Sequence, residues 1–212
     1  MTETPIAHAH QFDSMEHQHE TSYLGMWLFL GTEVMFFGGL FVAYAVYRYL
    51  YPAAFAEGSS HTNLLLGSIN TGILLVSSLM MALAVRAAQL DQRKRLVMFL
   101  LLTIVFGTIF LGIKGYEYYH EYQEGLVPGI FFTYTGEHAA QVALFFVFYF
   151  FMTGLHAVHM TIGLGVVAVI AFLAWRGKFS SSHYTPVEGT GLYWHFVDMV
   201  WVFLYPLLYL IN

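Results

Sequence analysis

A single carboxylate stands inside the first long apolar stretch of this sequence. Glu33 lies about ten residues after Tyr23, where that stretch begins, so a helix would place it about 15 Å deep, near the middle of a bilayer. A carboxylate at that depth costs roughly 2.5–3.5 kcal/mol on insertion scales. We therefore predict that Glu33 is a protonated, neutral acid unless a buried partner charge opposes protonation. The residues that surround it on its own helix face are apolar: Met26, Phe29, Leu30, Phe36, Phe37 and Leu40.

Two roles are open for this carboxyl. It can be a neutral group that forms a hydrogen bond with a neighbouring helix, or it can be a group that exchanges protons or reacts. The opposite face of the same helix carries Gly31 and Gly38, and small residues at such spacing predict a close contact with another helix.

Two histidines in the fourth apolar stretch are the second candidate for chemistry. The sequence has no cysteine, so a metal here would need histidine and carboxylate ligands. A histidine pair three residues apart supplies two ligands at most, and Glu33 and His195 lie on other stretches. Hydrogen bonding between helices is the favoured interpretation, and a metal site is the alternative. The small and polar groups aligned in this stretch are Thr153, His156, His159, Met160 and Gly163.

The last apolar stretch contains a histidine and an aspartate, His195 and Asp198, three residues apart. This spacing allows a direct hydrogen bond between the imidazole and the carboxylate, and Trp194 and Trp201 flank the same region. A buried ion pair or neutral pair is the favoured interpretation, and a proton relay is the alternative.

The N-terminal segment carries its own group of histidines: His8, His10, His17 and His19. A short His-rich run can bind a metal, but on a polar tail it is more often solvated. Residues 1–22 also lack the pattern of a secretory signal, namely a cationic stretch, a short apolar run and a cleavage site. We expect residues 1–22 to form a polar, His-rich cytoplasmic tail and residues 23–212 to form one membrane domain.

The composition and the apolar stretches of the sequence predict the helices that carry these polar residues. Hydrophobic residues make up 58% of the 212 residues and charged residues only 10%, with a mean hydropathy of +0.62, which excludes a soluble domain, a disordered chain and a nucleic-acid binder. Crossing a bilayer takes about 20 apolar residues. We predict an all-α, multi-pass membrane protein, a bundle of five transmembrane helices at about 23–47, 64–85, 96–115, 139–175 and 191–211.

Orientation follows from the loops between these stretches. Lys and Arg gather in the two loops that join the second stretch to the third and the fourth to the fifth, and cations favour the cytoplasmic side. We therefore predict a cytoplasmic N-terminus and a periplasmic C-terminus. The residues are Arg86, Arg93, Lys94, Arg95, Arg176 and Lys178.

Five motifs together resemble subunit III of haem–copper cytochrome c oxidase. Their order and spacing match that family from about Tyr23 to Asn212, and Glu188 falls where the family has a loop glutamate. The motifs are GTEVMFF at 31–37, NTGILL at 70–75, EY at 117–118, TGLHAVH at 153–159 and YWHFVDMVW at 193–201.

The resemblance implies specific roles. Glu33 would be the family's carbodiimide-reactive intramembrane carboxyl, and the polar residues of structural or lipid-proximal role would be His156, His159, Glu188, His195 and Asp198. The subunit would hold no metal, no cofactor and no catalytic residue, because the haems and copper belong to subunits I and II. It would pack against subunit I, contact subunit II, hold phospholipid, and support proton uptake and oxygen access. A small subunit IV is a further candidate partner.

We interpret the chain as an accessory subunit of a proton-pumping terminal cytochrome c oxidase in a bacterial inner membrane, which acts as an enzyme only within that complex. The first alternative is the equivalent subunit of a quinol oxidase or a nitric-oxide reductase. The second is an autonomous membrane metalloenzyme. The chain lacks the two helices that precede the carboxyl-bearing helix in long family members, and it has His183-Tyr184 in place of a His-His pair.

Overall fold

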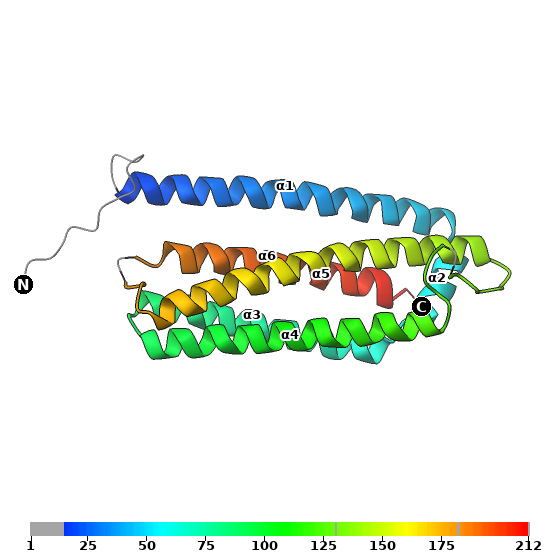
Figure 1. Cartoon of the computed structure of the whole chain (residues 1–212). Coiled ribbons are helices and arrows are strands. Elements are labelled where there is room, and N and C mark those ends of the chain that lie inside the picture. Colours follow the sequence, from blue (N-terminus) through cyan, green and yellow to red (C-terminus); the bar gives the residue numbers. More distant parts are fainter. Residues whose placement is uncertain (1–14, 130, 182, 212) are drawn as a thin grey trace, which may run out of the picture.

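The computed structural model describes residues 15–129, 131–181 and 183–211 as a bundle of helices running roughly alongside one another (Figure 1). Five of the helices in the described residues are long and apolar enough to cross a membrane, and no strand element lies among those residues. The predicted fold class is therefore confirmed. The helices are α1 (Met15–Leu50), α2 (Pro52–Ser60), α3 (Leu64–Gln89), α4 (Arg93–Gln123), α5 (Ala139–Trp175) and α6 (Thr185–Tyr209).

Several helices extend beyond the predicted apolar stretches. α1 begins at Met15 rather than near residue 23, and α4 continues to Gln123 rather than ending near residue 115. Hydropathy marks only the part of a helix that suits hydrocarbon, whereas polar residues such as Glu and Gln continue the same helix in water. Of the four histidines near the N-terminus, His8 and His10 lie outside the described residues.

The short helix α2 has no counterpart in the hydropathy pattern. Pro52 is favourable at its first turn, because the N–H that proline lacks would have no partner within the helix there. A side chain added at Gly58 would come within 2.6 Å of the Phe145 ring, so the α2 backbone lies directly against α5. Ser59 donates a hydrogen bond of 2.9 Å to the Leu208 carbonyl near the end of α6. α2 therefore closes one end of the bundle.

The four helices α3, α4, α5 and α6 form the bundle itself, each in contact with two others around a core that contains Phe110, Tyr149, Trp194 and Trp201. α1 lies along the side of this bundle, against α5 and α6 (Figure 1). Many of its large apolar side chains are exposed, including Met35 at 80%. α1 is thus the least enclosed of the five long helices.

The close helix contact predicted at Gly31 and Gly38 is not formed with any part of the chain that the structure describes. No heavy atom of the described residues lies within 4 Å of a Cβ built at either glycine, apart from each glycine's own neighbours along the helix. The reason is that Leu30, Phe37 and Tyr44 supply the buried side of α1, so the glycine side points away from the bundle.

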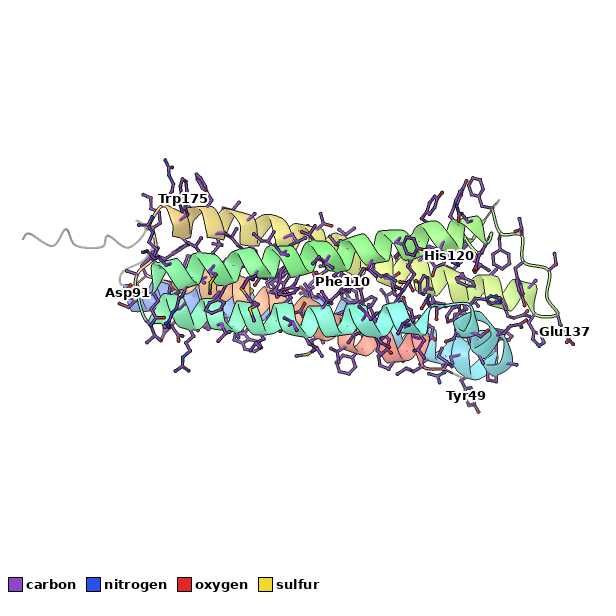
Figure 2. All side chains as sticks on the ribbon, turned by 90° about the horizontal axis from the view of Figure 1, so that it is seen from below. Tyr49, Asp91, Phe110, His120, Glu137 and Trp175 are labelled. Carbon is purple, nitrogen blue, oxygen red and sulfur yellow. The ribbon has the colours of Figure 1, made fainter. Side chains whose placement is uncertain are left out.

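Charge separates the two ends of the molecule. Asp91 and Trp175 mark one end, and His120, Glu137 and Tyr49 mark the other (Figure 2). We call the first the cationic end, because six of the eight Lys and Arg residues lie in or next to its two turns, between α3 and α4 and between α5 and α6. The second is called the acidic end, after Glu57, Glu117, Glu121, Glu124 and Glu137.

Candidate functional site

Glu33 meets His159 across the interface between α1 and α5. The imidazole Nε2 lies 3.1 Å from Glu33 Oε2, and the two side chains are 16% and 19% exposed, respectively. The Phe37 ring packs at 5.3 Å from the His159 ring. The structure therefore brings together two predicted site residues that stand far apart in the sequence.

The other nitrogen of His159 limits the protonation states of this pair. Nδ1 lies 2.9 Å from the Leu155 carbonyl oxygen, which can only accept, so Nδ1 carries a proton. Nε2 then either accepts a proton from a neutral Glu33 or donates one to an ionised Glu33. These two states differ only in the position of one proton along the 3.1 Å contact.

His156 is turned toward a different helix from His159. It is 1% exposed, and its Nε2 lies 3.1 Å from the Val197 carbonyl oxygen on α6, to which it donates. The rings of Phe110 and Trp201 lie 5.6 Å and 5.2 Å from its ring. His156 therefore joins α5 to α6, and the two histidines of the predicted pair do not converge on one point.

The direct hydrogen bond that the spacing of His195 and Asp198 allows is not formed. His195 Nδ1 lies 2.7 Å from the Ser78 hydroxyl on α3. Asp198 is only 4% exposed, and neither of its carboxyl oxygens has a hydrogen-bond partner within the described residues. Both side chains lie near Ser78 of α3, and its hydroxyl is the hydrogen-bond partner of His195.

Glu188 lies in the first turn of α6, beside Tyr23 of α1. It therefore lies where the first and last long helices meet, away from Glu33. Among the described residues there is no group of three or more His, Asp or Glu side chains placed to hold a metal ion.

Sequence reasoning missed a buried charged cluster near the acidic end, which we call the Lys114 cluster: Lys114, Glu117, Glu121, Tyr149 and Tyr209. Lys114 Nζ lies 2.9 Å from Glu117 Oε2, and both side chains are 4% exposed. The spacing of residues 114, 117 and 121 places them on one face of a helix, and this signal was available in the sequence. The cluster was not predicted because Lys114 lies at the end of an apolar stretch, where the side chain of a cation ordinarily reaches the lipid headgroups.

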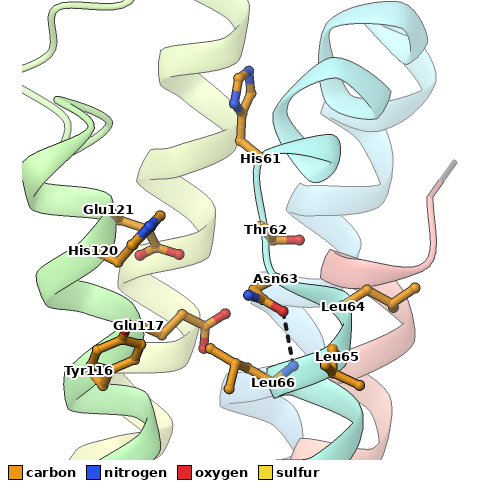
Figure 3. A pocket seen from close by; sticks show the side chains of 10 residues that line it. All are labelled: His61, Thr62, Asn63, Leu64, Leu65, Leu66, Tyr116, Glu117, His120 and Glu121. Carbon is orange, nitrogen blue, oxygen red and sulfur yellow. Dashed lines mark hydrogen bonds between the residues drawn. The ribbon is translucent and has the colours of Figure 1, made fainter.

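A cavity of about 440 Å³ opens beside this cluster, between the last turns of α4 and the turn from α2 to α3 (Figure 3). Figure 3 shows the carboxyl groups of Glu117 and Glu121 on the side of α4 that faces this turn. Asn63 holds the turn by accepting a hydrogen bond of 3.1 Å from the Leu66 N–H. Two imidazoles, His61 and His120, also line the cavity.

The known proteins that this chain resembles are third subunits of cytochrome c or quinol oxidases. The family model described as cytochrome c oxidase subunit III matches residues 9–212. A cytochrome c oxidase subunit 3 of Synechocystis is 36% identical over 191 residues, which cover 88% of this chain and 74% of that protein. A probable quinol oxidase subunit 3 of Staphylococcus haemolyticus is 28% identical, covering 94% of both chains. A cytochrome bo(3) ubiquinol oxidase subunit 3 of Pseudomonas aeruginosa is 28% identical, covering 98% of this chain and 95% of that one.

Proposed function

This chain belongs to the cytochrome c oxidase subunit III family, and from that premise we propose that it is the accessory third subunit of a proton-pumping terminal oxidase. In this role it stabilises subunit I, binds phospholipid, and supports proton uptake and oxygen access. The observation that carries the proposal is the family match over nearly the whole chain, together with the five long helices.

The proposal includes no haem, metal or catalytic residue in this subunit, with the redox centres held by subunits I and II. The arrangement of the candidate ligands supports this division. His156 is bound to the Val197 carbonyl, His159 to Glu33 and the Leu155 carbonyl, and His195 to Ser78. Each imidazole is thus engaged with its own helix or a different neighbouring helix rather than directed to a shared centre.

Glu33 is proposed to be a functional carboxyl that is neutral at pH 7. Its partner imidazole can accept the carboxyl proton, because the other ring nitrogen already donates to a carbonyl. Two neutral partners also avoid the desolvation cost of an ion pair in hydrocarbon, which is several kcal/mol per ion, in order of magnitude. The partial exposure of both side chains leaves the pair accessible to small apolar reagents.

The proposed setting is a bacterial inner membrane, with the cationic end in the cytoplasm and the acidic end outside. The exposed apolar side chains of α1 suit contact with acyl chains or with an apolar surface of another subunit. Subunit I is the main proposed partner, with subunit II and a small subunit IV as further contacts.

A quinol oxidase subunit is the second candidate function, since two relatives of nearly equal length carry that name. The electron donor distinguishes the two. The complex purified with this chain should oxidise reduced cytochrome c, and a complex that oxidises only quinol would support the second candidate.

The accessory role is tested by changing or removing the subunit within the complex. Deleting the chain should leave the haem spectrum intact while oxidase activity decays faster during turnover. Glu33→Gln should leave assembly and electron transfer intact and abolish labelling by an apolar carbodiimide. Glu137→Gln, which changes an exposed carboxyl, is the matched control and should retain labelling. Loss of the haems from a fully assembled core would contradict the proposal.

A further inference from the structure

The Lys114 cluster contains more negative than positive charge. Glu117 and Glu121 are 3% and 2% exposed, and within the cluster Lys114, itself 3% exposed, is the one cation that faces them. With all three groups ionised, the cluster would carry one uncompensated negative charge in a buried place. Such a charge is strongly unfavourable unless a proton or a cation neutralises it.

The hydrogen bonds assign the ammonium to Glu117 alone. An ammonium has three donors, and those of Lys114 go to Glu117 Oε2 at 2.9 Å, Tyr149 Oη at 2.9 Å and Tyr209 Oη at 2.8 Å. Tyr209 in turn donates to Glu117 Oε1 at 2.7 Å. Both oxygens of Glu117 and all three donors of Lys114 are therefore used.

Glu121 is the carboxyl that this network leaves out. Neither of its oxygens has a hydrogen-bond partner in the part of the chain that the structure describes. Tyr149 Oη lies 3.1 Å from Tyr209 Oη, and because the Tyr209 proton is given to Glu117, the Tyr149 proton can point to Tyr209 or toward Glu121. In either case Tyr149 is neutral and brings no positive charge to Glu121. The uncompensated charge of the cluster therefore belongs to Glu121.

The cavity gives Glu121 a connection to water. Glu121 is one of its lining residues, and so is His120, whose side chain is 57% exposed. One water molecule occupies about 30 Å³ of liquid, so a cavity of about 440 Å³ has room for several. A proton that passes between the buried carboxyl and the aqueous phase at the acidic end would take this route.

We propose that Glu121 is a proton-binding site, which takes up and releases one proton through this cavity while Lys114 and Glu117 remain a fixed ion pair. The ligand is a proton, because the described residues offer no group of three metal-ligating side chains here. The titratable and charged groups that face Glu121 come from α4, α5, α6 and the α2–α3 turn: Lys114, Glu117, Tyr118, His120, Glu124, Tyr149, Tyr209 and His61.

Infrared difference spectroscopy of the intact complex in phospholipid vesicles tests this proposal without relying on oxidase turnover. The wild-type minus Glu121→Gln spectrum at neutral pH should contain one carbonyl-stretch band of a protonated carboxylic acid. The band should shift in deuterated water, because the cavity allows exchange, and it should be lost as the pH is raised. Glu124→Gln, which changes an exposed carboxyl one turn away, should leave the band unchanged.

Two results would overturn the proposal. One is a wild-type spectrum with no acid band assignable to Glu121, which would mean that a bound cation compensates an ionised carboxylate. The other is a band that does not respond to deuterated water. Glu121→Asp covers the case in which the amide variant does not assemble, because it keeps the acid and should move the band without removing it.

Discussion

The pair Glu33–His159 and the Lys114 cluster are two solutions to the same problem, an acid placed among helices. The first consists of one 3.1 Å contact between side chains that are 16% and 19% exposed. The second consists of an ammonium with three acceptors, surrounded by side chains that are almost entirely buried. The first lies between α1 and the bundle, whereas the second joins α4, α5 and α6 inside it.

The two sites therefore differ in how easily a reagent can reach them and in how firmly they hold the helices together. A pair at the edge of a loosely attached helix can change partners or meet a reagent, because little of its surroundings must move. The ion pair inside the four-helix bundle is enclosed by buried side chains, and all three donors of Lys114 and both oxygens of Glu117 are matched. We therefore expect the Lys114 cluster to govern stability and the Glu33 pair to govern reactivity.

The largest effect is expected for Lys114→Met. Removing the cation leaves the Glu117 carboxylate buried without its partner charge, which should cost about 3–5 kcal/mol. The measurement is the denaturant concentration that releases the unfolded chain from the purified complex. Lys178→Met removes an exposed cation and should change stability by less than about 0.5 kcal/mol. Equal effects of the two substitutions would show that the cluster has no special energetic role.

A smaller effect is expected for His159→Leu, at about 0.5–1.5 kcal/mol, since it removes one hydrogen bond at a partly exposed place. If the pair is neutral, Glu33 stays protonated without its partner and carbodiimide labelling remains essentially unchanged. A large rise in labelling would instead mean that a charged imidazole holds Glu33 ionised in the wild type. His120→Leu, at an exposed position, is the control for stability.

The smallest effect concerns Tyr134, in the loop between α4 and α5, which donates a hydrogen bond to Glu57 of α2. This bond to a carboxylate raises the pKa of Tyr134 above its ordinary value. Its contribution to stability is thus fully present below about pH 10, the ordinary pKa of tyrosine, and is lost as the pH rises through the raised pKa. Unfolding curves at alkaline pH should therefore converge for wild type and Tyr134→Phe. A difference that grows with pH would contradict this.

Much of the fold could be predicted because bilayer thickness imposes a length on each apolar stretch. The fourth stretch, 139–175, coincides with α5. α2 could not be found in this way, because its nine residues form too short a segment for a hydropathy signal and owe their position to contacts with Phe145 and Leu208. Helix ends in water were also misplaced, since polar residues continue a helix as readily as apolar ones.

Several of the site residues could be predicted from the sequence, but their hydrogen-bond partners could not. Residue type and position identified five groups whose burial in a bilayer costs free energy unless each is neutral or paired. They are Glu33, His156, His159, His195 and Asp198. Spacing alone, however, allowed a hydrogen bond between His195 and Asp198, whereas in the structure His195 bonds to the hydroxyl of Ser78. Lys114 was not predicted as a site residue, and the structure buries it beside Glu117.

The amino-acid sequence by itself determined which segments span the membrane and which polar groups are costly inside it, because both depend on composition along one helix. Only the tertiary structure decided which partner each polar group meets, because that depends on how five long helices rotate and pack against one another. Glu33 of α1 contacts His159 of α5, and Lys114 of α4 donates hydrogen bonds to the phenols of Tyr149 on α5 and Tyr209 on α6. Each of these contacts joins two helices.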